Sequence, residues 1–167
     1  MKLAKSLNRL GTETAFSVLA EAKKLEASGK PMIHLGLGQP DFKTPKHVVD
    51  AAKKALDDGH HGYVLSNGIL ECRQAVSRKI KTLYNQDVDP ERIIIMPGGK
   101  PTMHYAIQCF GEPGVEIIHP TPAFPIYESM INYTGSTPVP YDLTKDKDLK
   151  FNAEEILSLI TDKTRLL

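Results

Sequence analysis

The second half of the chain alternates short apolar runs with segments whose apolar residues recur at helical spacing. This rhythm predicts strands over residues 93–96, 115–119 and 137–141, and helices over residues 101–110, 126–133 and 153–160. Asn152 and Glu155 occupy capping-box positions at the start of the last of these helices. Strands that alternate with helices predict an α/β fold with a mainly parallel sheet, helices on both faces, and ligands at the carboxyl ends of the strands.

The first half of the chain predicts an N-terminal helical arm and two further helices. The arm covers about residues 15–28 and is ended by Gly29, and residues 32–35 read as a short strand. Thr44 and Pro45 open the next helix as N-cap and first helical residue, and Gly59 ends it. We expect its buried face to carry five apolar residues: Val48, Val49, Ala52, Ala55 and Leu56. A loop over residues 60–68 and a helix over residues 70–84 follow.

The most informative stretch is residues 97–101, Pro-Gly-Gly-Lys-Pro, at the junction of a predicted strand and a predicted helix. Two glycines allow a sharp turn and a close approach of the backbone to a ligand, and Pro101 suits a first helical turn. The free N–H groups and the positive end of the helix dipole predict an anion site, to which Lys100 adds a charge. A tight turn with no ligand is the alternative, because neither a Walker loop nor a complete dinucleotide fingerprint is present.

The composition restricts the class of protein. The 167 residues suit one ordinary domain, and 21 basic against 20 acidic residues leave a net charge of +1. No basic run with interleaved aromatics indicates nucleic acid, and no apolar run approaches the roughly 20 residues that span a bilayer. We therefore expect a cytoplasmic protein whose two cysteines are reduced, with Cys109 packed as a small hydrophobe. The histidines His60, His61 and His104 lack the spacing of metal ligands, so we expect no metal site.

Residues 36–45, Gly-Leu-Gly-Gln-Pro-Asp-Phe-Lys-Thr-Pro, resemble a family signature. The pattern G-[EQ]-P-D-F-x-T-P is characteristic of the fold-type I, pyridoxal-phosphate-dependent aminotransferases of the aspartate aminotransferase group. Tyr63, the Gly-Gly-Lys turn and an aromatic residue in the proline-rich loop at 120–124 follow in the same order and spacing. The resemblance covers essentially the whole chain and implies pyridoxal 5'-phosphate as cofactor, with an amino acid and a 2-oxo acid as substrates.

The resemblance also implies roles for individual residues. Gly99 and Lys100 would hold the cofactor phosphate through backbone N–H groups, and Gly98 would shape the turn. Phe124 would stack on the pyridine ring, although a core aromatic is the alternative reading. Tyr63 would reach the phosphate bound by the neighbouring subunit, which implies a homodimer with a site shared across its interface. Gly38 would help bind the substrate α-carboxylate, or would only serve a turn that needs a positive φ.

The resemblance implies no catalytic residue within these 167 residues. Lys100 would lie at the phosphate end of the cofactor, whereas the aldehyde lies across the ring, so Lys100 is rejected as the lysine that forms the Schiff base. Family members are more than twice as long, and their Schiff-base lysine would follow Leu167. Residues 165–167 also resemble the start of a buried strand, so we expect a truncated chain that is inactive alone.

The expected organisation has residues 1–45 as an N-terminal arm with a substrate-loop segment. Residues 46–167 then form the first part of the cofactor-binding large domain. Two alternatives to a transaminase remain open. One is a pyridoxal-phosphate-dependent lyase or synthase of the same fold. The other is a non-catalytic, aminotransferase-like regulator domain, although no DNA-binding domain precedes Ala15. The substrate pair is not indicated.

Overall fold

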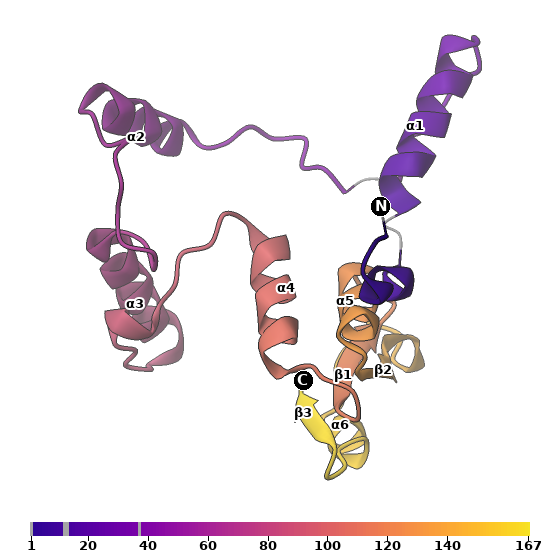
Figure 1. Ribbon diagram of the computed structural model, residues 1–167. Coiled ribbons are helices and arrows are strands. Elements are labelled where there is room, and N and C mark those ends of the chain that lie inside the picture. The colour runs from indigo at the N-terminus through magenta and orange to yellow at the C-terminus, as the bar shows by residue number, and fades with distance from the viewer. Residues whose placement is uncertain (1, 12–13, 37) are drawn as a thin grey trace. The chain divides into compact units, whose positions relative to one another are not determined.

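The protein was analysed as a computed structural model that describes residues 2–11, 14–36 and 38–167. Figure 1 labels the helices and strands. Along the chain the elements are η1 (Lys5–Arg9), α1 (Thr14–Ala27), α2 (Lys46–Asp57), α3 (Leu70–Tyr84), η2 (Pro90–Arg92), α4 (Gly99–Phe110), β1 (Glu116–Thr121), α5 (Ile126–Thr134), β2 (Thr137–Asp142), η3 (Leu143–Lys145), α6 (Ala153–Ser158) and β3 (Thr164–Leu166). The chain divides into two compact units, called unit 1 (residues 1–37 and 98–167) and unit 2 (residues 38–97). This division does not test the expected boundary at residue 45, which stays a prediction.

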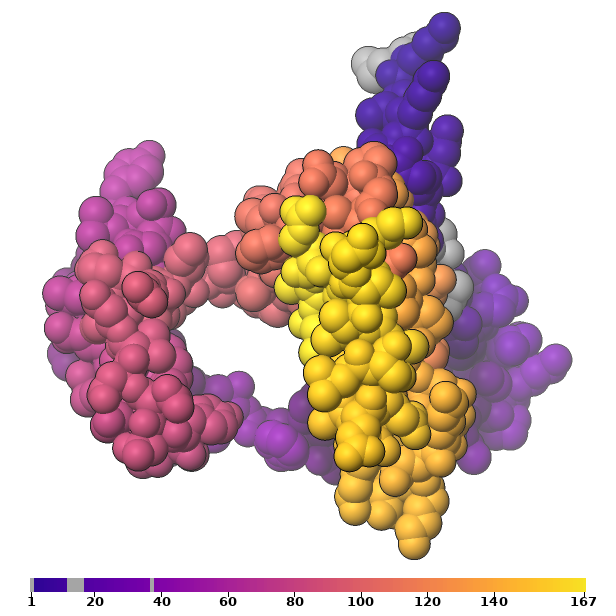
Figure 2. All heavy atoms as spheres, turned by 90° about the horizontal axis from the view of Figure 1, so that it is seen from below, coloured from indigo at the N-terminus to yellow at the C-terminus, as the bar shows by residue number. Residues whose placement is uncertain are grey.

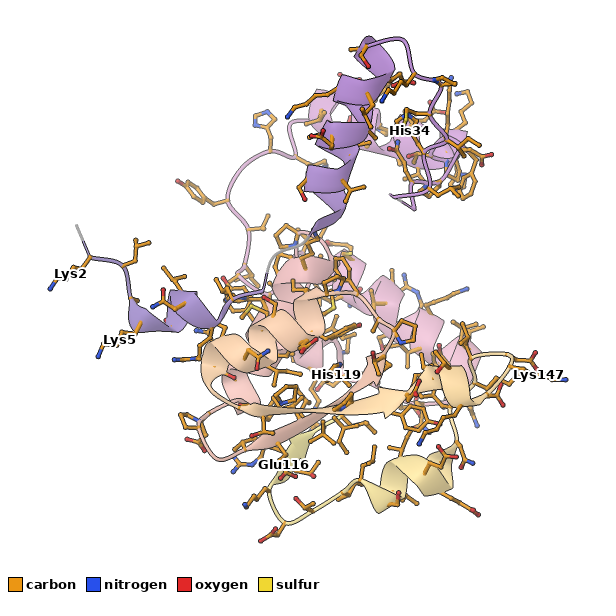
Figure 3. The ribbon with its side chains drawn as sticks, turned by 90° about the vertical axis from the view of Figure 1, so that its right-hand side faces the viewer. Lys2, Lys5, His34, Glu116, His119 and Lys147 are labelled. Atoms are coloured by element: carbon orange, nitrogen blue, oxygen red, sulfur yellow. The ribbon has the colours of Figure 1, made fainter. Side chains whose placement is uncertain are left out.

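Unit 1 contains a parallel sheet. In the described part of the chain, three strands form this sheet in the order β2-β1-β3. Ile117 lies opposite Pro138 of β2 and Leu166 of β3, so β1 is the central strand. Since β2 and β3 lie on opposite sides of β1 and the connections between parallel strands are right-handed, α5 and α6 cover opposite faces. Figure 3 shows α5 on one side of the strands and α6, in yellow, on the other. The predicted α/β class with a parallel sheet is confirmed.

The hydrophobic core of unit 1 lies between this sheet and two helices, α4 and α5. Its buried members come from α4, from β1 and the residue before it, and from α5: Ile107, Val115, Ile117, Met130 and Ile131. The opposite face carries a smaller contact, where Tyr141 stacks on Phe151 with ring centroids 5.9 Å apart. The Tyr141 hydroxyl also accepts a 2.8 Å hydrogen bond from the Asn152 N–H, which fixes the start of α6. Figure 2 shows the yellow C-terminal residues against the orange segment that contains α5 and β2.

Several predicted helix ends are confirmed by local backbone geometry. Gly29 and Gly59 follow α1 and α2 with φ values of +86° and +83°, the left-handed conformation that glycine adopts at little cost. The Asn152 side chain accepts hydrogen bonds from the N–H groups of Glu154 and Glu155, as an N-cap should. Helix α3 has the predicted bounds, and α2 begins one residue later than predicted.

The N-terminal segment of unit 1 is fixed to α5 through polar contacts. Arg9 donates to the carbonyl oxygens of Asn132 (2.9 Å) and Tyr133 (2.7 Å) in the last turn of α5. The backbone N–H of Gly11 donates to Ser129 Oγ at 2.9 Å. A guanidinium at this end of a helix satisfies carbonyl groups that lack intrahelical partners and complements the negative end of the dipole.

Four expectations from the sequence are wrong in the structure. The predicted strands at residues 32–35 and 93–96 are not strands, since neither joins a ladder in the described residues. The Ile95 N–H donates instead to the loop carbonyl of Asn67. The expected buried face of α2 is not buried, because no described element covers it: Leu56 is 64% exposed. Cys109 is exposed rather than packed.

Candidate functional site

The turn into α4 has the conformation that its glycines suggested. Gly98 is the N-cap residue, with φ +102° and ψ 167°, a region that is essentially restricted to glycine. Helix α4 begins at Gly99, two residues before the predicted start, so Pro101 is its third residue rather than its first. Proline still fits, because the first four N–H groups of a helix have no intrahelical partner. Gly98 therefore adopts a turn conformation that other residues adopt only with strain.

The space around this turn is open. An added Cβ at Gly98 or Gly99 would meet no atom within 4 Å. Gly98 brings no side-chain oxygen to cap the helix, and the first turn of α4 contains no acidic residue. The Thr102 hydroxyl donates to the Gly98 carbonyl oxygen at 3.2 Å and steadies the turn from inside the helix. The helix thus begins with its positive dipole end beside open space, which suits a phosphate group.

Phe124 and Lys100 lie together beside this turn. Phe124 belongs to the loop between β1 and α5, and its side chain is partly exposed. The Lys100 ammonium lies 5.3 Å from the centroid of the Phe124 ring, within the range of a cation–π contact. The structure thus brings together a glycine turn, a helix N-terminus, a cation and an aromatic face.

The other two predicted residues belong to unit 2 and are described within it. Tyr63 is fully exposed and lines a hollow of about 660 Å3 with Gly59, His60 and Ile69. Gly38 has open space around its Cβ position. Leu37, in the same signature, lies outside the described residues.

Three further observations concern the charge of Asp142, metal binding and membrane-spanning helices. Hydrogen bonds from the Thr144 hydroxyl and N–H lower the pKa of Asp142, which ends β2 and caps η3. Among residues 2–11, 14–36 and 38–167, no group of three or more histidines, cysteines and acidic residues could hold a metal ion. No helix in the same part of the chain has the length and apolar character to cross a membrane.

The sequence reasoning missed one residue, Arg73, whose side chain is 1% exposed. Its guanidinium bonds to two main-chain carbonyls and to Glu91. A signal was present in the sequence, because Arg73 lies three residues before Val76 and seven before Ile80, on the inward face of α3. A charged residue on an apolar helix face indicates a buried polar contact.

Comparisons with known proteins agree with the signature. The profile of the family described as aminotransferase class I and II matches residues 30–167. The chain is 34% identical over its full length to an aspartate aminotransferase of Bacillus subtilis (strain 168), of which it covers 42%. It is 35% identical over 99% of its length to (5-formylfuran-3-yl)methyl phosphate transaminase of Methanocaldococcus jannaschii, again covering 42%.

A solved structure gives the same result. The aspartate aminotransferase from Thermus thermophilus with maleate superposes with a TM-score of 0.89 at 29% identity, covering 99% of this chain and 44% of that one. The chain thus spans about 42% of the length of the curated relatives it matches.

Proposed function

Because this chain belongs to the class I and II aminotransferases, we propose that the complete protein is a pyridoxal-phosphate-dependent transaminase. It transfers an amino group between an amino acid and a 2-oxo acid, and these residues correspond to its N-terminal portion. The observation that carries the proposal is the Gly98-Gly99 turn at the start of α4, with Phe124 beside Lys100. That arrangement suits the phosphate end and one ring face of the cofactor.

The residues of this chain would act as follows. The N–H groups of Gly99 and Lys100 donate to the phosphate, and the helix dipole favours its charge. Phe124 stacks on the pyridine ring through its π-face and offers no hydrogen bond of its own. The Gly38 N–H helps orient the substrate α-carboxylate. Pyridoxal phosphate, when bound, supplies an electron sink for the amino-group transfer.

Gly99 gives a direct test of the phosphate site. An added Cβ at Gly99 would meet no atom within 4 Å outside its chain neighbours and its own helix backbone, so the turn has room for a side chain. Gly99→Val should therefore leave the fold intact and crowd only the ligand. We expect pyridoxal phosphate to bind the complete protein at least about 1–3 kcal/mol more weakly, because charge-assisted hydrogen bonds are lost. A titration followed by visible absorbance measures this, and unchanged affinity would remove Gly99 from the site.

A homodimer with shared sites is the proposed assembly, with Tyr63 donating to the phosphate in the neighbouring subunit. Mixing Tyr63→Phe protein with Gly99→Val protein tests this arrangement. A hybrid dimer then has one site with both defects and one site with neither, so half of the hybrid's sites should regain wild-type cofactor affinity. If subunit exchange is verified and no tight site returns, Tyr63 does not act across the interface.

Under this proposal the lysine that attaches the cofactor lies outside these residues, and the 167 residues alone are inactive. The support is that Lys100 lies at the helix N-terminus, the phosphate end, whereas the aldehyde of pyridoxal phosphate lies across the ring. We expect borohydride reduction of the 167-residue chain with pyridoxal phosphate to give no specific lysine adduct. One stoichiometric adduct, together with amino-group transfer, would contradict this part of the proposal.

A further inference from the structure

Arg73 is the most deeply buried charged side chain among the described residues, at 1% exposure, and the proposed chemistry does not use it. It lies on α3 in unit 2 (Figure 1). Burial of a guanidinium is costly unless its donors are satisfied, and here three acceptors surround it. Arg73 Nε donates to Gly68 O at 3.1 Å, and Arg73 Nη1 donates to Pro90 O at 2.9 Å and to Glu91 Oε1 at 2.8 Å.

These contacts join two loops that flank α3. Gly68 ends the loop that carries Tyr63. Pro90 is the first residue of η2, and η2 directly precedes residues 93–95. The same two segments meet a second time, where the Ile95 N–H donates to Asn67 O at 3.1 Å. Gly68 has a φ of +95°, and a Cβ there would lie 2.8 Å from the Ile95 side chain. The end of the loop is therefore held tightly against residues 90–95.

Tyr63 has no such anchorage of its own. Its side chain is fully exposed, so the direction of its hydroxyl depends on the loop backbone that carries it. That backbone is closed by a turn in which the Gly68 N–H donates to Leu65 O at 2.9 Å. The carbonyl oxygen of the same glycine accepts the hydrogen bond from Arg73 Nε. Tyr63 thus lies two residues before the turn formed by residues 65–68, and Arg73 holds the last residue of that turn.

We propose that Arg73 is a positioning residue, which holds the 60–68 loop so that Tyr63 can meet the cofactor phosphate. The inference rests on the proposed function, since it assigns Arg73 a purpose through Tyr63. A lysine at position 73 would keep the charge, but one ammonium cannot reproduce the fork that reaches Gly68 O and Pro90 O together. Arg73→Lys should therefore loosen the loop without leaving a buried charge entirely unpaired.

The test compares two probes, pyridoxal phosphate and pyridoxal, which differ only in the phosphate. We measure the ratio of their affinities for the complete protein in wild type, Tyr63→Phe, Arg73→Lys and the double variant. Tyr63→Phe should lower the ratio about tenfold or more, the effect of losing one hydrogen bond to a charged group. Arg73→Lys should lower it roughly threefold to tenfold, and the double variant should fall no further than Tyr63→Phe alone.

Ser77→Ala is the matched control. Ser77 also lies on α3, and its hydroxyl donates to Val88 O at 2.6 Å, so it tethers α3 to the chain before η2 without touching the loop. It should lower stability while leaving the affinity ratio unchanged. Hydrogen exchange gives a second readout: the Ile95 amide should exchange faster in Arg73→Lys and at the wild-type rate in Ser77→Ala. If Arg73→Lys does not fold, Gly68→Ala displaces the same loop through the Ile95 contact and should lower the ratio instead.

The outcomes separate the two claims. An unchanged ratio in folded Arg73→Lys, with a lowered ratio in Tyr63→Phe, overturns the positioning role and leaves the proposed site intact. Independent, multiplying losses in the double variant also overturn it. An unchanged ratio in Tyr63→Phe removes Tyr63 from the phosphate site, and the purpose proposed for Arg73 fails with it.

Discussion

Each of the two units is stabilised internally by a different kind of contact. Unit 1 buries a continuous apolar cluster between β1, α4 and α5, in which Ile131 is 0% exposed and Ile117 is 2% exposed. Among the described residues of unit 2, Ile93 and Arg73 are the buried side chains, and Arg73 is charged. Unit 1 thus derives its stability from hydrophobic burial, and unit 2 depends on hydrogen bonds between α3 and its flanking loops.

The proposed site residues are divided between these two kinds of surroundings. Gly98, Gly99, Lys100 and Phe124 adjoin elements of unit 1 that pack on a core. Tyr63 lies on a loop whose position is set by a few polar contacts. We therefore expect substitutions to have opposite rankings in the two units, with apolar truncation the more damaging in unit 1 and polar truncation the more damaging in unit 2.

The largest effect should come from the core of unit 1. Ile131→Ala removes a fully buried side chain and leaves a cavity, which should lower the free energy of unfolding by about 3 kcal/mol. Leu157→Ala, at a position on α6 that is 64% exposed, is the control and should change it by less than about 0.5 kcal/mol. Urea denaturation of the complete protein measures both. Equal losses would show that the apolar cluster is not what holds unit 1.

At the turn into α4, the same alanine substitution should have different effects on stability at the two adjacent glycines. Gly98→Ala places a side chain in a conformation reserved for glycine and should cost roughly 1–3 kcal/mol of stability. Gly99→Ala, with ordinary φ and open space, should be nearly neutral for stability. The same denaturation experiment compares them. A costly Gly99→Ala with a neutral Gly98→Ala would contradict the described turn.

In unit 2 the ranking should reverse. Ser77→Ala removes a partly buried hydrogen bond to Val88 O and should cost about 1 kcal/mol. Leu56→Ala, on the uncovered face of α2, should cost less than that in the isolated 167-residue chain. Thermal unfolding followed by circular dichroism measures both variants. A larger loss for Leu56→Ala would mean that the α2 face is covered in solution and that unit 2 also has an apolar core.

The smallest effect concerns Asp142 in unit 1. Hydrogen bonds from Thr144 lower its pKa in the folded state, so its carboxylate stabilises the fold above its unfolded value of about 3.8, and this contribution is lost as the pH falls through the folded pKa. Asp142→Asn should therefore be slightly less stable than wild type at pH 7 and equal to it near pH 2–3. Asp41→Asn is the exposed control. A difference that persists at low pH would assign the effect to something other than the charge.

The sequence predicted most of unit 1 because the necessary signals are local. Gly98-Gly99 identified the turn, Asn152 identified a cap, and the alternation after residue 110 identified β1, α5 and β2. The predictions of strands at 32–35 and 93–96 were wrong because a strand forms only with a hydrogen-bonded partner, and apolar residues alone do not specify that partner. The prediction of a buried face on α2 was wrong for a similar reason, since periodicity defines an apolar face but not which element covers it. Arg73 was missed because two of its three acceptors are main-chain carbonyls of loops, which residue spacing on α3 does not identify.

The central claim is that the turn at Gly98 and Gly99, with Phe124, receives the phosphate end of pyridoxal phosphate. The most direct measurement is a crystal structure of the complete protein with this cofactor bound. We expect phosphate oxygens within roughly 2.7–3.2 Å of the backbone nitrogens of Gly99 and Lys100, and the pyridine ring stacked on Phe124. A cofactor phosphate bound elsewhere, with the start of α4 facing only solvent, would contradict the claim.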